Sequence, residues 1–329
     1  MKALDFSVVI PVYNEKNNLP ELIARCLGAC KGTNRRFEII LVDDGSKDGS
    51  RDIITLAADL HTEVIAVILN RNYGQHAAVF AGLEQSKGEI VVTLDADLQN
   101  PPEEIPRLLY EMDQGVDVVG TVRQNRQDSV FRRVSSALVN RIVRQTTGVM
   151  MHDYGCMLRA YRRSVVNAML MCREHSTFIP ILANSFAGST KEIQVSHALR
   201  KNGKSKYHLA KLLSLQFDLL TSMSTFPLRL LSLMGAIISA CGIGFGALLM
   251  ALRIVYGASW AAEGVFTLFA VLFVFIGAQF IGLGLLGEYI GRIYHDVRGR
   301  PMYFVESIKG ESVNQTNENV LELKEGRIE

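Results

Sequence analysis

The chain lacks the features that mark several common protein classes. Its 329 residues include only five cysteines, and without a Cys-x-x-Cys pair these indicate small buried residues rather than a disulfide-stapled secreted module. The 35 basic and 33 acidic residues nearly cancel to a formal net charge of +2, so any surface that attracts anions must be local. A hydrophobic content of 48% excludes a disordered chain. No secretory signal is expected, because the apolar run Phe6–Val12 is short and contains Pro11.

Two stretches near the C-terminus contain no charged residue at all. Leu230–Leu252 and Gly264–Gly287 are each longer than the ~20 helical residues that cross a bilayer core. A helical hairpin buried in a soluble core is the alternative, but such helices seldom lack charge on every face over this length. The sequence therefore predicts two C-terminal transmembrane helices.

These uncharged stretches divide the chain into four predicted parts. A soluble domain over 1–206 precedes a juxtamembrane amphipathic helix at 207–229, two helices with a short periplasmic hairpin at 230–291, and a cytoplasmic tail at 292–329. Positive residues flank the helices, while the hairpin contains only Arg253, which predicts that both ends lie in the cytoplasm. The flanking residues are Lys211, Arg229, Arg292, Arg298 and Arg300.

Short apolar runs alternate with amphipathic stretches in the N-terminal part of the chain. This alternation predicts an α/β fold with a mainly parallel sheet and crossover helices. One helix start is marked by Asn18, Pro20 and Glu21, which have the spacing of a capping box. The predicted strands, rich in Val, Ile and Leu, are Ser7–Val12, Phe37–Val42, Val64–Leu69, Ile90–Leu94 and Val116–Thr121.

Polar residues, many of them acidic, follow the predicted strands. Ligands of an open parallel sheet bind beyond the carboxyl ends of its strands, so these residues are site candidates. Asp95 and Asp97 are the most specific pair, because alternate residues of an extended segment point to the same side. With an oxygen of Gln99 they suit Mg²⁺ or Mn²⁺ completed by substrate phosphates. The segments concerned are Tyr13–Glu15, Asp43–Ser46, Asn70–Gly74 and Asp95–Gln99.

Basic residues concentrate in two segments. Between Arg123 and Arg163 the only acidic residues are Asp128 and Asp153, and Arg200–Lys211 contains no acidic residue. Both segments are candidate anion sites. Nucleic acid is not the expected ligand, because the segments adjoin the predicted membrane helices and lack interleaved aromatic residues that could stack on bases.

Apolar residues recur at helical spacing in 131–142 and again in 209–223. Both patterns are typical of amphipathic helices lying on a membrane surface, where their basic residues would attract anionic headgroups. Packing of either apolar stripe on the sheet is the alternative.

These residues together resemble glycosyltransferase family two, and specifically its polyprenyl-phosphate glycosyltransferases, over almost the whole chain. The resemblance implies a nucleotide-sugar domain of the GT-A type joined to carboxy-terminal membrane helices. It rests on Pro11–Glu15, Asp43–Ser46, Asn70–His76, Asp95–Asp97, Leu98–Glu104, Asp153 ahead of Gly155 and Arg159, Ser176–Pro180, Arg200–Lys206 and Trp260–Gly264.

The resemblance also implies a role for each matching residue. Pro11, Tyr13, Glu15 and Asp44 would line the nucleotide pocket; Asp95, Asp97 and Gln99 would hold Mg²⁺ or Mn²⁺ on the UDP pyrophosphate; and Arg123, Arg126, Arg200 and Lys206 would contact phosphates. Asp153 would occupy the position of a catalytic base. A lipid phosphate is largely dianionic at pH 7 and needs no proton abstraction. An orienting group, a stabiliser of positive charge on the sugar ring, or a turn residue before Gly155 are therefore alternatives for Asp153.

The reaction implied by the resemblance is an inverting transfer of 4-deoxy-4-formamido-L-arabinose from UDP to undecaprenyl phosphate. It would take place on the cytoplasmic face of the bacterial inner membrane, for lipid A modification and polymyxin resistance. The residues alone indicate only that the donor is a nucleotide sugar and that the acceptor is a phosphate in the membrane. A UDP-hexose or GDP-mannose donor is therefore the alternative.

Two other classes are less favoured. A processive polysaccharide synthase would carry a QxxRW motif, but the only tryptophan, Trp260, lies in the predicted hairpin. A catalytically inactive membrane scaffold would leave the carboxylates after the strands without a role. A homo-oligomer is expected, because two helices are few for guiding a prenyl chain and the Gly242 and Gly246 spacing permits helix association.

Overall fold

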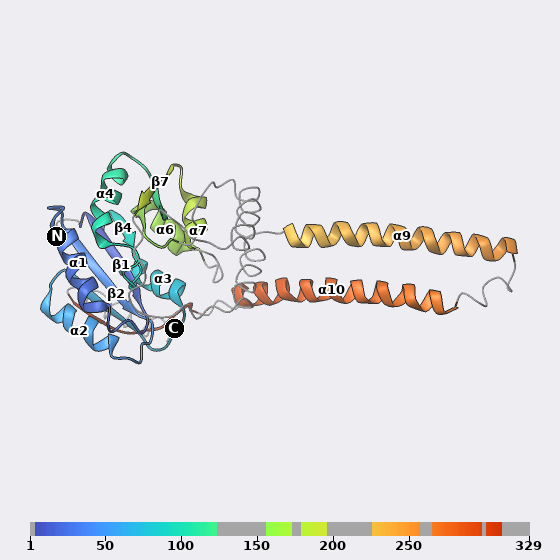
Figure 1. Ribbon diagram of the computed structural model, residues 1–329, viewed down its shortest axis with the longest axis horizontal. Helices are drawn as coiled ribbons and strands as arrows, with labels where there is room; N and C mark the ends of the chain where they lie inside the picture. The colour runs from blue at the N-terminus through green and yellow to red at the C-terminus, as the bar shows by residue number, and fades with distance from the viewer. Residues whose placement is uncertain are drawn as a thin grey trace, which may run out of the picture. The chain divides into compact units, whose positions relative to one another are not determined.

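The computed structural model describes residues 4–123, 156–172, 179–195, 226–256, 265–297 and 301–310 (Figure 1). The chain forms two compact units. The first contains residues 1–140, 147–206 and 300–329, and the second contains residues 141–146 and 207–299.

The first unit is built on an eight-stranded sheet with the order β7-β5-β6-β4-β1-β2-β3-β8. The pairs β1–β2, β2–β3, β1–β4 and β5–β7 are parallel, whereas β4–β6, β5–β6 and β3–β8 are antiparallel. The predicted α/β fold with a mainly parallel sheet is confirmed, and all five predicted strands are present. The strands are β1 (Phe6–Val12), β2 (Phe37–Asp43), β3 (Val64–Leu69), β4 (Ile90–Thr93), β5 (Val118–Arg123), β6 (Arg159–Arg162), β7 (Thr190–Val195) and β8 (Val305–Lys309).

Helices cover both faces of this sheet. Successive strand residues point to opposite faces, so in β1 the side chains of Val8 and Ile10 belong to one buried cluster and Val9 to the other. The first cluster also contains residues of α1 (Leu19–Lys31), α2 (Ser50–Leu60) and α4 (Ile105–Asp113), which follows the short 3₁₀ helix Pro102–Glu104. The second contains residues of α3 (Gln75–Gln85), α6 (Arg163–Met171) and α7 (Ile179–Phe186).

Helix α1 begins directly after Asn18, with Pro20 in its first turn, so the predicted start is confirmed. The predicted capping box is wrong. Asn18 already has helical dihedral angles (φ −93°, ψ −26°) and makes no side-chain cap bond, whereas a capping residue needs an extended backbone. Its Nδ2 atom instead donates to Glu15 Oε2 at 2.6 Å.

Strand β8 was not predicted from the sequence. It pairs antiparallel with β3, with Ala66 opposite Lys309 and Leu69 opposite Val305, and the register shifts between Ile68 and Leu69. Every residue of β3 is buried. Strand β8 therefore covers what would otherwise be a fully apolar edge strand, the kind of edge that invites pairing with other chains.

The second unit contains two long helices, α9 (Phe226–Tyr256) and α10 (Val265–Val297). They contain the two uncharged stretches, apart from Gly264, and extend beyond them into charged residues. None of the helices, as far as the structure describes their residues, is both long enough and apolar enough to span a membrane. The predicted amphipathic helices at 131–142 and 209–223 lie outside the described residues.

The packing of α3 on the sheet predicts the effect of a single methyl group. A Cβ atom at Gly82 would overlap Val9 Cγ1 and lie 3.1 Å from Val42 Cγ2. Gly82→Ala is expected to lower the free energy of unfolding by about 1–3 kcal/mol through overpacking, despite the better helix propensity of alanine. Urea unfolding of the full chain measures this change.

Gly28→Ala in α1 is the matched control. A Cβ atom there would have no neighbour within 4 Å. Only the better helix propensity of alanine then acts, and it should raise the free energy of unfolding by roughly 0.5–1 kcal/mol. Equal effects of the two substitutions would contradict the close packing of Gly82.

Candidate active site

The order β4-β1-β2-β3 brings the carboxyl ends of four parallel strands to one edge of the sheet. The loops that follow these strands carry the predicted nucleotide and metal residues, so the structure gathers them at the place where open α/β sheets bind ligands. Pro11 lies at the end of β1 opposite Val42. Tyr13 is 47% exposed, and Glu15 is half-buried beside α1.

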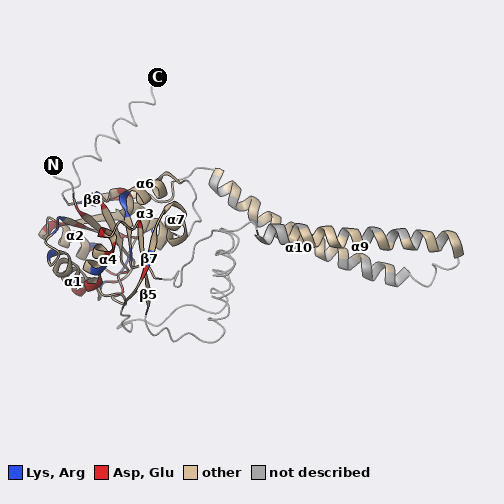
Figure 2. Cartoon of the chain, turned by 90° about the horizontal axis from the view of Figure 1, so that it is seen from above, with Lys and Arg blue, Asp and Glu red and all other residues tan. Residues whose placement is uncertain are grey.

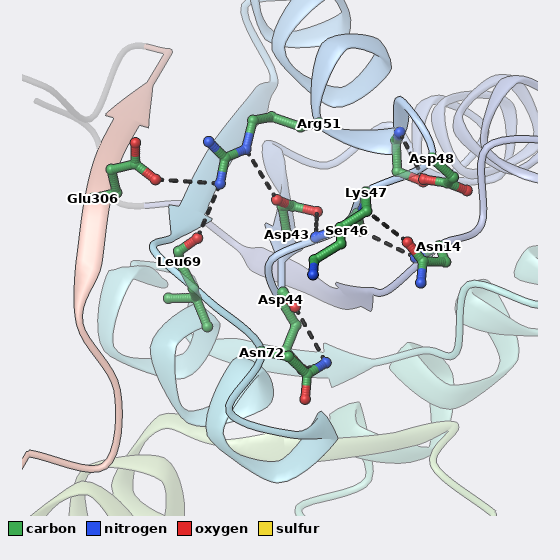
Figure 3. A network of polar contacts seen from close by, with 11 residues as sticks. Asn14, Asp43, Asp44, Ser46, Lys47, Asp48, Arg51, Leu69, Asn72 and Glu306 are labelled. Carbon is green, nitrogen blue, oxygen red and sulfur yellow. Dashed lines mark hydrogen bonds and ion pairs between the residues drawn. The ribbon is translucent and has the colours of Figure 1, made fainter.

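Asp44 is the most heavily bonded of the predicted nucleotide residues. Its side chain is buried and accepts hydrogen bonds from three donors of the loop after β3. Tyr73 N donates to Oδ1 at 2.7 Å, and both Gly74 N and Asn72 Nδ2 donate to Oδ2 at 2.9 Å. Figure 3 shows the contact between Asn72 and Asp44. Burial raises the pKa of the Asp44 carboxyl, and the two backbone N–H donors act in the opposite direction. Asp44 therefore fixes the loop 70–74 from inside the protein.

The loops after β1 and β2 are joined by a second set of hydrogen bonds. Asn14 N donates to Ser46 Oγ at 3.0 Å, and Lys47 N donates back to Asn14 Oδ1 at 2.9 Å. Asn14 has φ 56°, a left-handed conformation that asparagine tolerates better than most residues. The two loops therefore form one unit directly beside Tyr13.

Lys16 and Asp48 extend the same connection. Lys16 N donates to Asp48 Oδ2, and Ser50 N donates to Asp48 Oδ1, each at 3.0 Å. Burial acts to raise the pKa of the Asp48 carboxyl, but the hydrogen bonds from Ser50 and Lys16 outweigh it, and the pKa lies below its ordinary value. Asp48 therefore remains an ionised acceptor that holds the start of α2 against the loop after β1.

Gly45 allows the loops after β2 and β3 to approach one another. It has φ +68°, and a Cβ atom at this position would lie 2.5 Å from the carbonyl carbon of Arg71 and 2.6 Å from Asn72 N. Only glycine fits such a close backbone approach. The Asp44-Gly45 pair thus sets the distance between the two loops.

The two carboxylates among the three candidate metal ligands, Asp95 and Asp97, do not lie in an extended strand as the sequence predicted. Strand β4 ends at Thr93, and Ala96 and Asp97 lie in a turn, so the alternation of an extended strand does not explain their arrangement. Asp95 Oδ1 accepts a hydrogen bond from Gln75 Nε2 at 2.7 Å, and Asp97 Oδ1 accepts one from Gln99 N at 3.1 Å. All three predicted ligands are half-buried. Among the described residues, no group of three or more His, Cys, Asp or Glu side chains is arranged for a metal ion.

Several predicted site residues lie outside the described part of the chain. Arg123 is the last residue of β5, and its side chain is not among those described. The same holds for the whole of Arg126, Asp153, Arg200 and Lys206. Their roles stay predictions.

Three arginines of the first basic segment bind backbone carbonyls instead of facing a free anion site. Arg159 is fully buried and donates through Nε to Cys156 O at 2.8 Å. Arg162 donates to Met112 O and Val116 O, and Arg163 donates to Gly88 O. These three residues support β4, β5 and β6, and the side chains of the other arginines of the segment are not among those described.

Comparisons with known proteins identify the class to which this fold belongs. The sequence profile described as glycosyl transferase family 2 matches residues 7–170. A relative from Pseudomonas syringae, described as undecaprenyl-phosphate 4-deoxy-4-formamido-L-arabinose transferase, is 62% identical over 92% of this chain and 90% of its own length. A relative from Yersinia pestis with the same description is 59% identical over 95% of this chain and 96% of its own.

The solved structure of mannosyl-3-phosphoglycerate synthase from Rubrobacter xylanophilus shares the fold, with a TM-score of 0.51 at 18% identity over 71% of this chain and 75% of that chain. The first unit is thus a GT-A-like α/β domain, and the chain belongs to glycosyl transferase family 2 and is a glycosyltransferase. Within that family it is similar, over nearly its whole length, to the formamido-arabinose transferases. The resemblance read from the motifs is confirmed.

Replacement of the Asp44 carboxylate tests its role in holding the loop 70–74. Asp44→Asn replaces one acceptor oxygen with an NH₂ donor that faces the N–H groups of Tyr73 or Gly74. The amides of Tyr73 and Gly74 are expected to exchange with solvent at least about tenfold faster, because leaving buried donors unpaired costs about 1–3 kcal/mol. Hydrogen-exchange mass spectrometry or NMR measures this, and unchanged protection would contradict the anchoring role.

Proposed function

We propose that this chain transfers 4-deoxy-4-formamido-L-arabinose from UDP to undecaprenyl phosphate. The observation that carries the proposal is the identity of 62% and 59%, over more than nine-tenths of this chain, with two transferases of that description. The geometry supports a nucleotide-sugar donor, because the predicted nucleotide residues lie in loops at the carboxyl edge of parallel strands.

The proposed reaction is a direct displacement with inversion. An oxygen of the lipid phosphate forms a bond to the anomeric carbon of the sugar while the bond from that carbon to the UDP oxygen breaks, and UDP leaves with the electron pair. A phosphate monoester is largely dianionic at pH 7 and is already a nucleophile. Asp153 is proposed to act at this centre, either as the base or by orienting the acceptor beside the sugar ring.

Asp95, Asp97 and Gln99 are proposed to hold a divalent cation, Mg²⁺ or Mn²⁺. Their oxygens fit such an ion, because magnesium sites in proteins commonly use one or two carboxylates and leave other positions to substrate phosphates and water. When bound, the cation would stabilise negative charge on the leaving pyrophosphate.

The remaining contacts to UDP are assigned by position. Pro11, Tyr13, Glu15 and Asp44 are proposed to form the nucleoside pocket, with the half-exposed Tyr13 ring as its accessible side. Phosphate contacts are proposed for Arg123, Arg126, Arg200 and Lys206.

Helices α9 and α10 are proposed to embed the enzyme in the bacterial inner membrane, with the catalytic domain on the cytoplasmic side and the product destined for lipid A modification. The support is the uncharged stretches Leu230–Leu252 and Gly264–Gly287, which make up most of the two helices, and the exposure of the described apolar side chains, among them Ile237, Leu248 and Phe280. Figure 2 marks the described Lys and Arg residues and the Asp and Glu residues of the first unit on the ribbon. The side chains of the charged residues within α9 and α10, which are Arg229, Arg253, Glu288, Arg292 and Asp296, are not among those described. Association of several copies through these helices is part of the proposal.

The donor is tested with purified protein, undecaprenyl phosphate and a panel of nucleotide sugars in the presence of Mg²⁺ or Mn²⁺. Lipid-linked product, detected by mass spectrometry, is expected only with the UDP-linked formamido-arabinose donor. The unformylated 4-amino-arabinose donor is the closest control. Product from a UDP-hexose or GDP-mannose instead would retain the glycosyltransferase and overturn the donor assignment.

The metal site is tested by Asp97→Ala. Calorimetric titration with UDP is expected to show Mg²⁺-dependent binding in the natural protein and at least about tenfold weaker binding in the variant, because the cation then lacks one of its carboxylates. Asp59→Ala removes an exposed carboxylate near the end of α2 and serves as the charge control. Equal UDP affinity of the Asp97→Ala and natural proteins at each metal concentration would count against the assignment.

A further inference from the structure

We propose that Arg51 is a positioning residue for the nucleotide-binding loops and that the C-terminal strand β8 holds it in place through Glu306. Strand β8 would then be a working part of the nucleotide site rather than a cover for the sheet edge. The inference rests on the proposed function only in taking UDP as the nucleotide.

Arg51 joins the ends of three strands. It is the second residue of α2 and lies over the carboxyl edge of the sheet. Its Nε pairs with Asp43 Oδ2 at 3.3 Å, at the end of β2, and its Nη2 donates to Leu69 O at 3.1 Å, at the end of β3. The same Nη2 pairs with Glu306 Oε2 of β8 at 3.2 Å. Figure 3 shows these three contacts converging on one guanidinium.

The Asp43 carboxylate connects Arg51 to the loops after β1 and β2. Asp43 is fully buried, and its other oxygen, Oδ1, accepts a hydrogen bond from Ser46 N at 3.1 Å. Ser46 Oγ in turn accepts the hydrogen bond from Asn14 N. A continuous polar chain therefore runs from Glu306 through Arg51 and Asp43 to the residue beside Tyr13.

The residues just before β8 also contact the loop after β3 directly. Phe304 O accepts a hydrogen bond from Asn70 N at 3.3 Å, and Asn70 Oδ1 accepts one from the Tyr73 hydroxyl at 2.8 Å. Tyr303, two residues before β8, donates its hydroxyl to Glu84 at the end of α3. The segment 303–306 thus touches both elements that flank the loop 70–74.

The setting of Arg51 differs from that of an ordinary surface ion pair. Exposed pairs contribute little to stability, and the Arg51 and Glu306 side chains are 37% and 49% exposed. The Asp43 side chain is 0% exposed, however, and removing the partner of a buried carboxylate is costly. Because Nε and Nη2 are engaged by protein oxygens, the geometry favours positioning of the loops over a direct contact with substrate.

Arg51→Met and Arg51→Lys test the positioning role in the full chain. Arg51→Met keeps the aliphatic stem and removes every donor, so the Ser46 amide is expected to exchange at least about tenfold faster and UDP to bind about tenfold more weakly. Arg51→Lys keeps one charge near Asp43 and should recover part of both effects. The expected kinetic signature is a raised KM for the donor with a smaller change in kcat, because loops that bind the nucleotide are loosened.

Arg35→Met is the matched control for loss of a paired arginine. Arg35 pairs with Asp113 at the end of α4, with Nη1 to Oδ1 at 3.1 Å, and is expected to change neither Ser46 exchange nor UDP affinity. Normal Ser46 protection in a folded Arg51→Met protein would overturn the proposal. Faster Ser46 exchange in a chain whose natural form does not bind UDP would support the positioning role and overturn the proposed function, so the two failures are distinguishable.

The contribution of β8 is tested without touching Arg51. Gly310 directly follows β8 with φ +112°, and a Cβ atom there would lie 2.7 Å from Val64 O, so Gly310→Ala should displace the end of the strand. Gly115→Ala is the control, because Gly115 has φ +90° but no neighbour within 4 Å of an added Cβ atom. Faster Ser46 exchange and weaker UDP binding in Gly310→Ala alone are expected. Loosened β8 amides with unchanged Ser46 exchange and unchanged UDP affinity would overturn the role of β8.

Discussion

Two adjacent carboxylates buried at the end of β2 organise the edge of the sheet where the nucleotide is proposed to bind. Asp43 accepts a hydrogen bond from the loop after its own strand and forms an ion pair with Arg51. Asp44 accepts hydrogen bonds from three donors of the loop after β3. Ionised oxygens that accept several N–H donors form stronger hydrogen bonds than neutral carbonyls. This pair therefore joins the loops after β2 and β3 to the sheet, and the hydrogen bond from Asn14 to Ser46 adds the loop after β1.

Because the two carboxylates are buried, their hydrogen bonds hold the loops firmly, and the loss of any one partner is costly. Each is at most 2% exposed, so water cannot replace a lost partner, and the cost of an unpaired group falls on the folded state. Gly45 lies between the loops with its backbone against Arg71 and Asn72. The hydrogen bonds of Asp43 and Asp44 hold the loops together, and the absence of a Cβ atom at Gly45 allows their backbones to approach closely.

The apolar core was predictable from the sequence, because a short run of Val, Ile and Leu indicates a strand that is buried on both faces. The positions of Asp44, Asp95 and Asp97 after such runs were predictable for the same reason, since a strand end is defined by the run before it. Their geometry was not. Asp97 lies in a turn rather than in an extended segment, and a local pattern of alternate residues cannot distinguish the two.

Arg51 escaped the sequence analysis because its partners are far away in the chain. Asn72 and Gln75 lie in segments that the sequence singled out, but their contacts with Asp44 and Asp95 were not predicted. Arg51 begins a helix whose pattern records only its buried face, and its contact Glu306 is separated from it by both long helices. The mixed sequence of β8, Val-Glu-Ser-Ile-Lys, is too short and too polar to mark a strand on its own. The signal that could have found it is the all-buried pattern of β3, which requires a neighbour on its outer side.

The position of β8 in the chain has a consequence for how the site is completed. Residues 305–309 follow α9 and α10, yet they pair with β3 in the N-terminal unit. Domains fold as their residues are synthesised, beginning from the N-terminus, so β1 to β7 precede the two long apolar helices and β8 follows them. The contact between Arg51 and Glu306 can therefore form only after both helices have been synthesised. The three loops at the nucleotide edge reach their full set of contacts only in a chain that already contains both helices.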